Sequence, residues 1–395
     1  MKIALTGGTG LLGRNLLLEA ISQNMDKIES LKIFLLGREQ ENFTLEKRLI
    51  LDLIPELLSS LPLENRQELL GILKKNIIPV PLHLTKDCLG MSESDLLQIK
   101  GCPIDLFIHS AALTDFRSDP STSTRLDEIN INGTKRVLKL IKTLQVKQLA
   151  YVGSAYACGN KYGIIDPIDS GLEGSFRNHY EKTKLVAETI TKEFAISNNI
   201  KLKIFRPSTI SGRLINSPLG LTNKFDVFYG WAAFFLRYKL KLVSSPLKIF
   251  EETVEIKVRI AVNPEGGLNI VPVDYAAKML IAACKHDTPD GSYHLVNSQE
   301  IKNIDCISWM LKALNITGHE FVDKEPDDKN KFEEFYYKTV GKIFTPYITC
   351  NPMLFCKKNL DAVEERIGIS CPVVNEENFG KLMSYAKSKI FGLEI

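Results

Sequence analysis

The chain has 395 residues, with 50 Lys and Arg against 47 Asp and Glu and a formal net charge of +3. Hydrophobic residues make up 44% and charged residues 25%, a balance that is typical of soluble globular proteins and excludes collagen-like, coiled-coil and globally disordered chains. At about 150 residues per domain the length allows two or three domains, and the near-neutral charge gives no reason to expect a nucleic-acid partner.

The cysteine spacing and the apolar runs indicate the cellular compartment of the protein. The eight cysteines form no Cys-x-x-Cys pair and the six histidines lack zinc-ligand spacing, which predicts reduced thiols and no metal site. Gly7 and Gly8 interrupt the first apolar run before it reaches the about 7 to 15 residues that a signal peptide needs. No stretch reaches the roughly 18 apolar residues of a membrane-spanning helix. We therefore expect a cytoplasmic protein without a transmembrane segment.

Short apolar runs alternate with helical patterns along the first half of the chain. Helical spacing is expected over 11–21 and 129–144, and a longer stretch over 39–76, rich in Leu, Glu and Lys, indicates inserted helices. The expected strands cover 3–5, 31–36, 77–84, 104–109, 148–152 and 204–207. Strands that alternate with helices imply right-handed βαβ units and a doubly wound parallel sheet of the α/β class.

Beyond residue 210 the pattern changes. An aromatic-rich helical stretch is followed by charged alternation over 251–260, which indicates a strand or a solvated ribbon. Residues 267–273 resume a strand and lead into a helix over 274–284, for which Asp274 is the expected N-cap. Because no Gly/Ser linker separates the two halves, the C-terminal part is expected to pack against the first.

A glycine-rich turn follows the first expected strand and opens the first expected helix. Glycines at 7, 10 and 13 permit a tight turn, close approach of backbone N–H groups to a pyrophosphate, and close packing of helix on strand. Between a strand and a helix this pattern indicates a dinucleotide site, and a plain tight turn is the alternative. The residues expected to contact the cofactor are Thr6, Gly7, Thr9, Gly10, Leu11, Leu12 and Gly13.

The end of the second strand indicates which dinucleotide is bound. An acidic residue there accepts hydrogen bonds from the ribose 2′-OH, whereas an arginine pairs with a 2′-phosphate. The chain reads Leu-Gly-Arg at 36–38, with no carboxylate before Glu39, and a planar guanidinium suits a phosphate. Arg38 therefore predicts NADPH as the cofactor, with Arg14 and Arg48 as candidate helpers, and a solvated surface arginine is the alternative.

A tyrosine and a lysine four residues apart form the expected catalytic pair. Tyr180 and Lys184 share one face of a helix, and the ammonium is expected to lower the pKa of the phenol. Tyr180 would deliver a proton to a carbonyl oxygen while a hydride arrives at carbon. Ser154, at the end of the fifth strand, would donate to the developing oxyanion. A surface helix pair is the alternative for the tyrosine and lysine.

Several motifs over residues 1–295 together resemble the extended short-chain dehydrogenases/reductases. They are the glycine turn, His109-Ser110-Ala111-Ala112, Asn130 to Thr134, the segment around Ser154, Tyr180 with Lys184, Phe205 to Ser208 and Val271 to Tyr275. Within that superfamily the chain looks most like the fatty acyl-CoA reductases and the thioester-reductase domains of carboxylic acid reductases and non-ribosomal peptide synthetases. That likeness lies in residues 36–38 followed by 46–49, in the inserted helices, and in residues 89–92.

The resemblance implies roles for individual residues. Ser154, Tyr180 and Lys184 would form the catalytic triad, and Asn130 would support the proton relay. This branch commonly carries Gly-Asp after the third strand to meet the adenine, whereas this chain reads Leu-His at 82–83, so that contact is not carried over. The cofactor's ribose and nicotinamide would be lined by Ala111, Ala112, Pro207 and Ser208.

Aromatic residues gather between 225 and 238 at helical spacing. One interpretation is core packing, and the other is an apolar wall for an acyl or aryl substrate. Arg237, Lys239 and Lys241 would meet the phosphates of coenzyme A or of a carrier protein's pantetheine arm, or form a solvated face. The aromatic residues are Phe225, Phe228, Tyr229, Trp231, Phe234, Phe235 and Tyr238.

These expectations combine into one function. Residues 1–210 are expected to form an NADP-binding Rossmann-type domain with the insertion at 39–76 and a returning segment at 267–300, and 211–395 otherwise to form a smaller substrate-binding lobe. The resemblance implies NADPH-dependent reduction of an acyl thioester, carried by coenzyme A or a carrier protein, to an aldehyde, with onward reduction to the alcohol left open. The alternatives are another extended family member that acts on a ketone or nucleotide sugar as reductase, epimerase or dehydratase, and a non-catalytic NADP-binding sensor.

Overall fold

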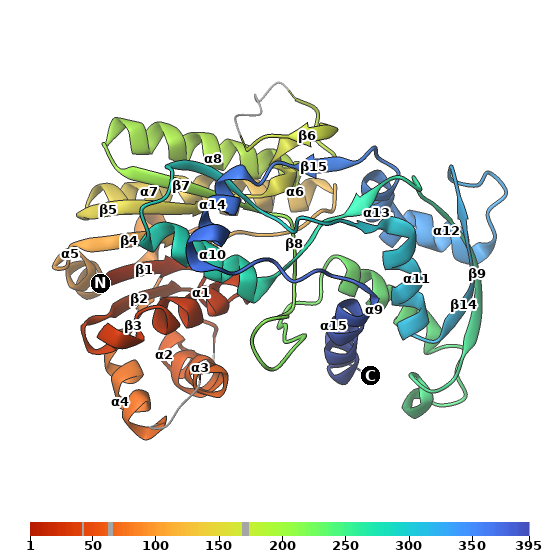
Figure 1. Cartoon of the computed structure of the whole chain (residues 1–395), viewed down its shortest axis with the longest axis horizontal. Helices are drawn as coiled ribbons and strands as arrows, with labels where there is room; N and C mark the ends of the chain where they lie inside the picture. Colours follow the sequence, from red (N-terminus) through yellow and green to blue (C-terminus); the bar gives the residue numbers. More distant parts are fainter. Residues whose placement is uncertain (42, 62–65, 168–173, 395) are drawn as a thin grey trace.

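The computed structural model describes residues 1–41, 43–61, 66–167 and 174–394, and it centres on one seven-stranded sheet. The strand order is β12-β7-β5-β4-β1-β2-β3, and every neighbouring pair is parallel (Figure 1). The expected doubly wound parallel sheet is thus confirmed. Its strands are β1 (Lys2–Thr6), β2 (Lys32–Gly37), β3 (Ile77–Pro81), β4 (Ile104–His109), β5 (Val146–Val152), β7 (Lys201–Pro207) and β12 (Gly291–Leu295).

Helices cover both faces of the sheet because successive strand residues point to opposite sides. In β2, Ile33 and Leu35 pack in one cluster with α1 (Leu11–Ser22) and α10 (Val273–Lys285). Phe34 and Leu36 pack in another cluster with α7 (Gly133–Lys142), on the face that α8 (His179–Ser197) also covers. All four side chains are almost completely buried, as expected for the interior of a parallel sheet.

The third strand ends earlier than its sequence pattern predicts. β3 stops at Pro81 rather than at Leu84, and among the described strands it pairs only with β2, as the edge strand of the sheet. Prolines 79 and 81 lack an N–H and are tolerated there because the outer side of an edge strand needs no partner. The chain then leaves the sheet, so that residues 82–85 line the cavity described below.

Within the inserted stretch 39–76, the described residues form helices over 45–60 and 66–76, as expected, whereas 39–41 and 43–44 are not helical; residues 42 and 62–65 lie outside the described part of the chain. Its apolar side packs in the same cluster as α1 and α10. The elements are α2 (Leu45–Arg48), a π-helical turn (Leu49–Leu53), α3 (Ile54–Ser60) and α4 (Arg66–Asn76).

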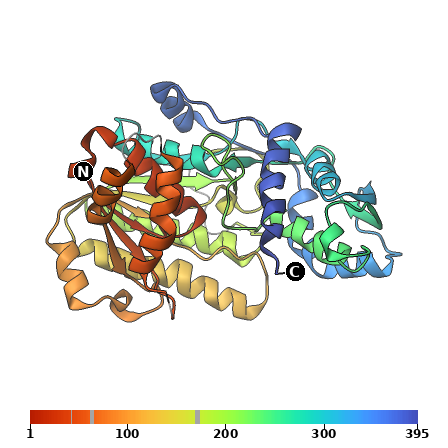
Figure 2. The same cartoon turned by 90° about the horizontal axis from the view of Figure 1, so that it is seen from below.

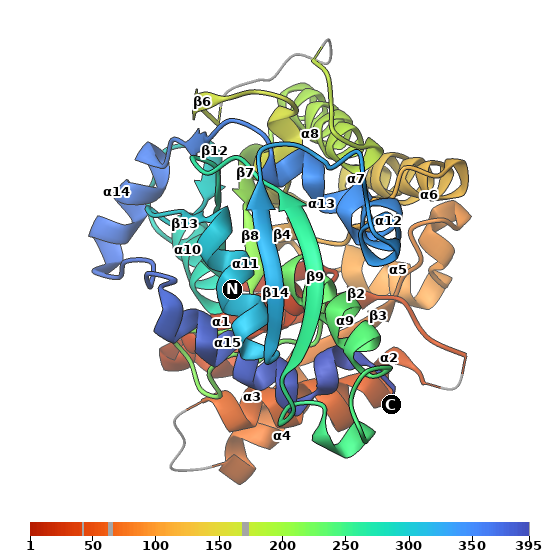
Figure 3. The same ribbon diagram turned by 90° about the vertical axis from the view of Figure 1, so that its right-hand side faces the viewer.

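The C-terminal part builds a second hydrophobic core. Strand β9 (Val254–Ala261) confirms the strand expected near 251–260, and β14 (Ile316–Val322) runs parallel beside it (Figure 3). Figure 2 shows this core and the N-terminal third on opposite sides of the molecule, with α15 on the side of the core that faces the N-terminal third. Across the described residues, none of the helices combines the length and apolar character needed to span a bilayer. The helices of this core are α9 (Phe228–Lys239), α11 (Asn303–Ala313), α12 (Lys331–Lys338), α13 (Val340–Ile348) and α15 (Glu376–Ser388).

The two halves interlock through segments that return to the sheet. β12 is the edge strand beside β7, α10 packs on α1, and α14 (Lys358–Ile367) packs on both α10 and β12. The division of the chain near residue 210 stays a prediction. Short pairs also join distant segments: β8 (Thr209–Ser211) with β11 (Ile270–Pro272), β10 (Gly267–Leu268) with β13 (Ile301–Lys302), and β6 (Gly163–Ile165) with β15 (Met353–Phe355).

The expected N-cap role of Asp274 is wrong. Helix α10 begins at Val273 with Pro272 as its N-cap, so Asp274 lies inside the first turn. Its buried carboxylate accepts hydrogen bonds from the three backbone N–H groups of residues 214–216, at 3.2, 2.7 and 2.7 Å. Asp274 therefore anchors the loop after β8, through contacts about sixty residues away in sequence that no local pattern reveals.

Candidate active site

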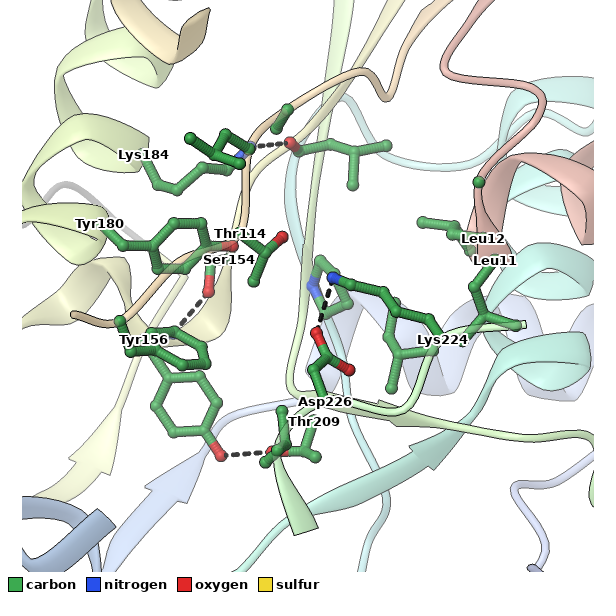
Figure 4. A pocket seen from close by; sticks show the side chains of 18 of the residues that line it. Leu11, Leu12, Thr114, Ser154, Tyr156, Tyr180, Lys184, Thr209, Lys224 and Asp226 are labelled. Atoms are coloured by element: carbon green, nitrogen blue, oxygen red, sulfur yellow. Dashed lines mark hydrogen bonds and ion pairs between the residues drawn. The ribbon is translucent and has the colours of Figure 1, made fainter. Parts of the chain in front are cut away.

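A cavity of about 540 Å³ lies at the carboxyl ends of the central strands. The glycine turn and the segments after β2 and β3 line one end of the cavity, and α9, α11 and α13 line the other. Figure 4 shows Tyr180, Ser154 and Lys184 on one side and Leu11 and Leu12 on the opposite side. Open α/β sheets bind ligands at this edge, so the cavity is the candidate site.

The glycine turn leaves no space for side chains. Gly7 has a φ of +76°, and a Cβ there would lie 2.8 Å from the backbone nitrogen of Ala111. A Cβ on Gly13 would lie 2.0 Å from the carbonyl oxygen of Gly7. Helix α1 starts at Leu11 with no side-chain N-cap and no acid in its first turn, so its free N–H groups and dipole favour an anion. The turn therefore fits a pyrophosphate.

Thr6 supports this turn from behind. Its hydroxyl contacts Nδ1 of His109 at 2.8 Å and accepts hydrogen bonds from the backbone N–H groups of Ser110 and Ala111, both at 3.2 Å. It is fully buried and is not among the described residues that line the cavity. Thr6 thus holds the end of β1 to the end of β4, a position that fits support of the cofactor wall better than direct contact.

Three arginines cluster at the nucleotide end and have different partners. Arg38 is exposed and lines the cavity. Arg14 forms an ion pair with Asp52 and donates to the Thr9 carbonyl at 3.0 Å, while Arg48 lies 3.9 Å from Asp52. Burial, together with the charges of Arg14 and Arg38, lowers the pKa of Arg48 against the opposing effect of Asp52. Positive charge is therefore concentrated beside Arg38, which alone of the three lines the cavity within the described residues.

Tyr180 lines the cavity from the first turn of α8. Burial raises the pKa of Tyr180 to about 12, and side-chain hydrogen bonds with Ser154 and Thr114 oppose this rise. The expected lowering by Lys184 is wrong, because burial disfavours the charged phenolate and outweighs the other influences. The phenol consequently keeps its proton at neutral pH and is able to donate it.

Lys184 lies one turn further along α8, with 3% of its surface exposed. Its Nζ donates to the Val152 carbonyl at 2.7 Å and lies 5.1 Å from the ring centroid of Tyr151. Burial lowers the pKa of Lys184 to about 8, against the effect of Glu188. Because an ammonium has three donors, these contacts leave capacity for a ligand hydroxyl in the cavity.

Asn130 lies on a π-helical turn, Asp127–Asn132, between α6 (Pro120–Leu126) and α7. Its Oδ1 accepts from the Leu113 backbone N–H at 2.8 Å, and its Nδ2 donates to the Thr183 hydroxyl at 3.1 Å. Asn130 is 2% exposed and is not one of the described cavity-lining residues. Its contacts hold the loop after β4 against the residue next to Lys184, and its role in a proton relay stays a prediction.

One cavity brings most of the sequence-predicted residues together. Thr6, Arg48 and Asn130 lie behind its walls instead, and residues 82–83 line it although no adenine contact was carried over to them. The predicted residues that line the cavity are Gly7, Thr9, Gly10, Leu11, Leu12, Gly13, Arg38, Ala111, Ala112, Ser154, Tyr180, Lys184, Pro207 and Ser208.

The aromatic stretch divides between the cavity and the core. Phe228 and Trp231 line the cavity, whereas Tyr229 and Phe235 are at most 1% exposed inside the C-terminal core. Phe344 of α13 also lines the cavity and stacks on Trp231, with ring centroids 5.1 Å apart. The stretch therefore supplies side chains to both the cavity lining and the core, and its role as a wall for an acyl or aryl substrate stays a prediction.

Lys239 is neither a phosphate ligand nor a solvated residue. Its side chain is fully buried and donates to the carbonyls of Glu252 and Leu314, both at 2.6 Å. Burial lowers the pKa of Lys239 to about 8. Its sequence neighbours Arg237 and Lys241 are exposed, so only these two remain available for an anionic ligand.

Several residues of the cavity wall were not predicted from the sequence. Thr114 and Phe116 follow β4, and the Phe116 ring meets the Tyr180 ring edge-on at a centroid distance of 5.1 Å. Lys224 and Asp226 form an ion pair of 2.6 Å between Tyr180 and the glycine turn (Figure 4). These residues lie on loops without a recognisable motif. Only Asp226, an acid two residues before the start of α9, carries a local signal.

A glycine turn that faces a buried Tyr180 and Lys184 across one cavity, at the edge of this sheet, is the arrangement of an extended short-chain dehydrogenase/reductase. The comparison with known families agrees, because residues 5–280 match the profile of an NAD-binding family described as "Male sterility protein". Since the match covers more than half of the chain, the protein belongs to this family.

Curated relatives resemble parts of the chain. Probable fatty acyl-CoA reductase 5 of Arabidopsis thaliana is 31% identical over 166 residues, which are 41% of this chain and 32% of that protein. The L-2-aminoadipate reductase large subunit of Eremothecium gossypii is 26% identical over 243 residues, 58% of this chain and 16% of that protein. The chain thus matches about a third or less of the length of these relatives.

Solved structures share the fold over nearly the whole chain. The terminal R domain from the myxalamid PKS-NRPS biosynthetic pathway superposes with a TM-score of 0.71 at 22% identity, covering 99% of this chain and 91% of that one. A structure of MoeE5 in complex with UDP-glucose and NAD superposes with a TM-score of 0.61 at 13% identity, covering 99% and 100%. At these identities the likeness establishes the fold alone.

Proposed function

We propose that the protein is an NADPH-dependent reductase of acyl thioesters. The single observation that carries this proposal is the continuous cavity, which joins a glycine turn fit for a pyrophosphate, a buried protonated phenol and an apolar wall. A sugar site needs several polar contacts, whereas the far wall here consists mainly of aromatic and aliphatic side chains. The fatty acyl-CoA reductases among the curated relatives support the same substrate class.

The residues present fit NADPH. The free N–H groups at the start of α1 would hold the pyrophosphate, and the exposed Arg38 would pair with the 2′-phosphate. Ala111, Ala112, Pro207 and Ser208 also line the cavity and would contact the ribose and the nicotinamide. NADPH, when bound, supplies the hydride that attacks the thioester carbonyl carbon.

The chain's own side chains would protonate the carbonyl oxygen and hydrogen-bond to it. Tyr180 donates its proton to that oxygen, and Ser154, which hydrogen-bonds with Tyr180, directs a hydroxyl at the same point. The resulting hemithioacetal collapses to a thiol and an aldehyde. Lys184 keeps its ammonium beside this site at neutral pH, where it is able to hold a ribose hydroxyl and oppose negative charge.

The acyl group would lie against α9, α11 and α13. Trp231, Met310 and Phe344, one from each helix, line that end of the cavity. Burial of an alkyl or aryl group there is favourable by about 25 cal/mol per Å² of apolar surface. The wall therefore favours an apolar acyl substrate over a hydrated sugar.

The test is NADPH oxidation by the full chain with panels of acyl-CoA, acyl-carrier thioesters, free aldehydes, ketones and nucleotide sugars. We expect turnover of thioesters, with Tyr180→Phe protein as the inactive control. Turnover of a ketone or a nucleotide sugar, with none of thioesters or aldehydes, would overturn the proposal. The nucleotide released on denaturation adds an independent readout, because a nucleotide-sugar epimerase is expected to retain NAD.

A further inference from the structure

A buried polar cluster links the acyl wall to the turn that carries Tyr180. Tyr347 of α13 donates its hydroxyl hydrogen to Oε1 of Glu181 at 2.7 Å, and its oxygen accepts from Nδ2 of Asn178 at 2.6 Å. Asn178 is the N-cap of α8, and its Oδ1 accepts from the Glu181 backbone N–H at 3.1 Å. Both partners of the Tyr347 hydroxyl therefore flank Tyr180 in the first turn of α8.

The cluster is built around a buried ion pair. The side chains of Arg177 and Glu181 are 3% and 0% exposed. Oε2 of Glu181 accepts from the Arg177 backbone N–H at 3.0 Å, and the Arg177 guanidinium lies 5.2 Å from the Tyr347 ring centroid. Burial raises the pKa of Glu181, against the effects of Arg177 and Tyr347. A buried charge that loses one partner is costly, so this geometry is held firmly.

Aromatic ring contacts also connect Tyr347 with Tyr180. The Tyr347 ring lies 6.0 Å from Phe116, and Phe116 lies 5.1 Å from Tyr180, measured between centroids. Tyr347 and its helix neighbours Phe344 and Ile348 line the cavity. The helix that would contact the acyl group is thus the helix that holds the first turn of α8.

We propose that Tyr347 is a positioning residue through which the acyl-binding wall sets the geometry of Tyr180. This inference rests on the proposed function, because it assigns Tyr180 as the proton donor to an acyl substrate. An acyl group packed against Phe344 and Ile348 stabilises α13. The hydrogen bonds of the Tyr347 hydroxyl to Glu181 and Asn178 then stabilise the first turn of α8. The binding energy of acyl atoms that lie far from the carbonyl then raises kcat.

Tyr337 provides a matched control. It lies on α12, in the same C-terminal core, and its hydroxyl donates to the Arg259 carbonyl and accepts from the Ala261 backbone N–H, both at 2.9 Å. Tyr337→Phe therefore removes as many hydrogen bonds as Tyr347→Phe. Tyr337 does not line the cavity among the described residues, and its hydroxyl contacts no part of α8.

The test combines hydrogen exchange with kinetics on the two full-length variants. Tyr347→Phe is expected to speed amide exchange in residues 174–184, whereas Tyr337→Phe leaves that segment at the wild-type rate. With acyl thioesters long enough to reach α13, Tyr347→Phe lowers kcat by about ten- to a hundredfold while KM and NADPH affinity stay close to wild type. The wild-type advantage in kcat of long over acetyl thioesters disappears in Tyr347→Phe alone.

The outcomes separate this inference from the proposed function. A wild-type protein that reduces no thioester refutes the proposed reaction, and the exchange comparison still decides the role of Tyr347. Equal exchange in the 174–184 segment of both variants overturns the inference, as does an equal loss of kcat in both.

Discussion

The two ends of the cavity are built from different parts of the chain. At the nucleotide end the glycine turn contributes a wall of backbone, because Gly7 and Gly13 leave no room for a Cβ. At the end proposed for the acyl group the wall consists of side chains, with Trp231 and Met310 contributed by separate helices of the C-terminal core. Volume-conserving changes are tolerated in a packed side-chain wall at about 1.5 kcal/mol or less, whereas a backbone wall admits none. The contrast suggests a fixed cofactor site next to an adjustable substrate site.

Tyr180 lies where the two ends meet, so its loss is expected to have the largest effect. Tyr180→Phe removes the only proton that the phenol offers and should lower kcat by about a thousandfold, within the usual range for a general acid. NADPH affinity, measured by nucleotide fluorescence, should stay unchanged because the ring remains in place. Retention of near wild-type kcat would mean that another group, such as Ser154, protonates the oxygen.

The backbone wall is tested by adding one methyl group. A Cβ on Gly13 would lie 2.0 Å from the Gly7 carbonyl oxygen, so Gly13→Ala must displace the turn at a cost of about 1–3 kcal/mol. We expect NADPH affinity to fall by about ten- to a hundredfold, the equivalent of that cost. Gly71→Ala is the matched control, because nothing lies within 4 Å of a Cβ there. Equal nucleotide titrations for the two variants would contradict the fixed character of this wall.

A substitution of Arg38 tests whether the nucleotide end of the cavity includes the contact to the 2′-phosphate. Arg38→Ala should reduce the preference for NADPH over NADH in kcat/KM by about tenfold or more, because a hydrogen bond to a charged group contributes about 1.5–3 kcal/mol. Arg237→Ala, another exposed arginine, serves as the control. An unchanged preference in Arg38→Ala would assign the 2′-phosphate contact to a different group, for which His83, which also lines the cavity, is a candidate.

The nucleotide wall was also the part that the sequence predicted best. The glycine turn, Arg38 and the Tyr180–Lys184 pair are local patterns, and each ends on the cavity because parallel strands bring their carboxyl ends to one edge. The parallel direction of the strands follows from the same alternation of strands and helices, whereas their order in the sheet was not predicted. The spacing of residues in the sequence therefore predicted the site wherever the residues that act together are also close in sequence.

The acyl wall could not be predicted in the same way. Trp231, Met310 and Phe344 come from three segments that meet only through the packing of the C-terminal core. Asp274 and Lys239 show the same limit, since their partners at residues 214–216 and 314 are remote in sequence. The raised pKa of Tyr180 belongs here too, because burial, its main cause, is a property of the assembled site.

The adjustable character of the acyl wall is tested by a larger side chain that reduces the volume of the cavity beside it. Ile307 of α11 lines the cavity and is 2% exposed. Ile307→Phe should lower kcat/KM for long acyl thioesters by about tenfold, the effect of a few lost contacts in an apolar pocket, and leave acetyl thioesters unaffected. Ile196→Phe, the same change at a surface position, is the control. An equal loss for long and short thioesters would show that the acyl group does not reach α11.

The smallest expected effect is a shift of the alkaline limb in the pH profile of kcat. Burial lowers the pKa of Lys184 to about 8 and raises that of Tyr180 to about 12. As the pH rises through about 8, Lys184 therefore loses its charge first and activity falls, while Tyr180 still holds its proton. In Lys184→Arg the side chain stays charged, so the limb in the residual activity should move to higher pH, whereas Lys182→Arg, at the exposed neighbour on α8, should leave it in place. A limb that stays near pH 8 in Lys184→Arg would assign this titration to another group at the boundary between the two walls.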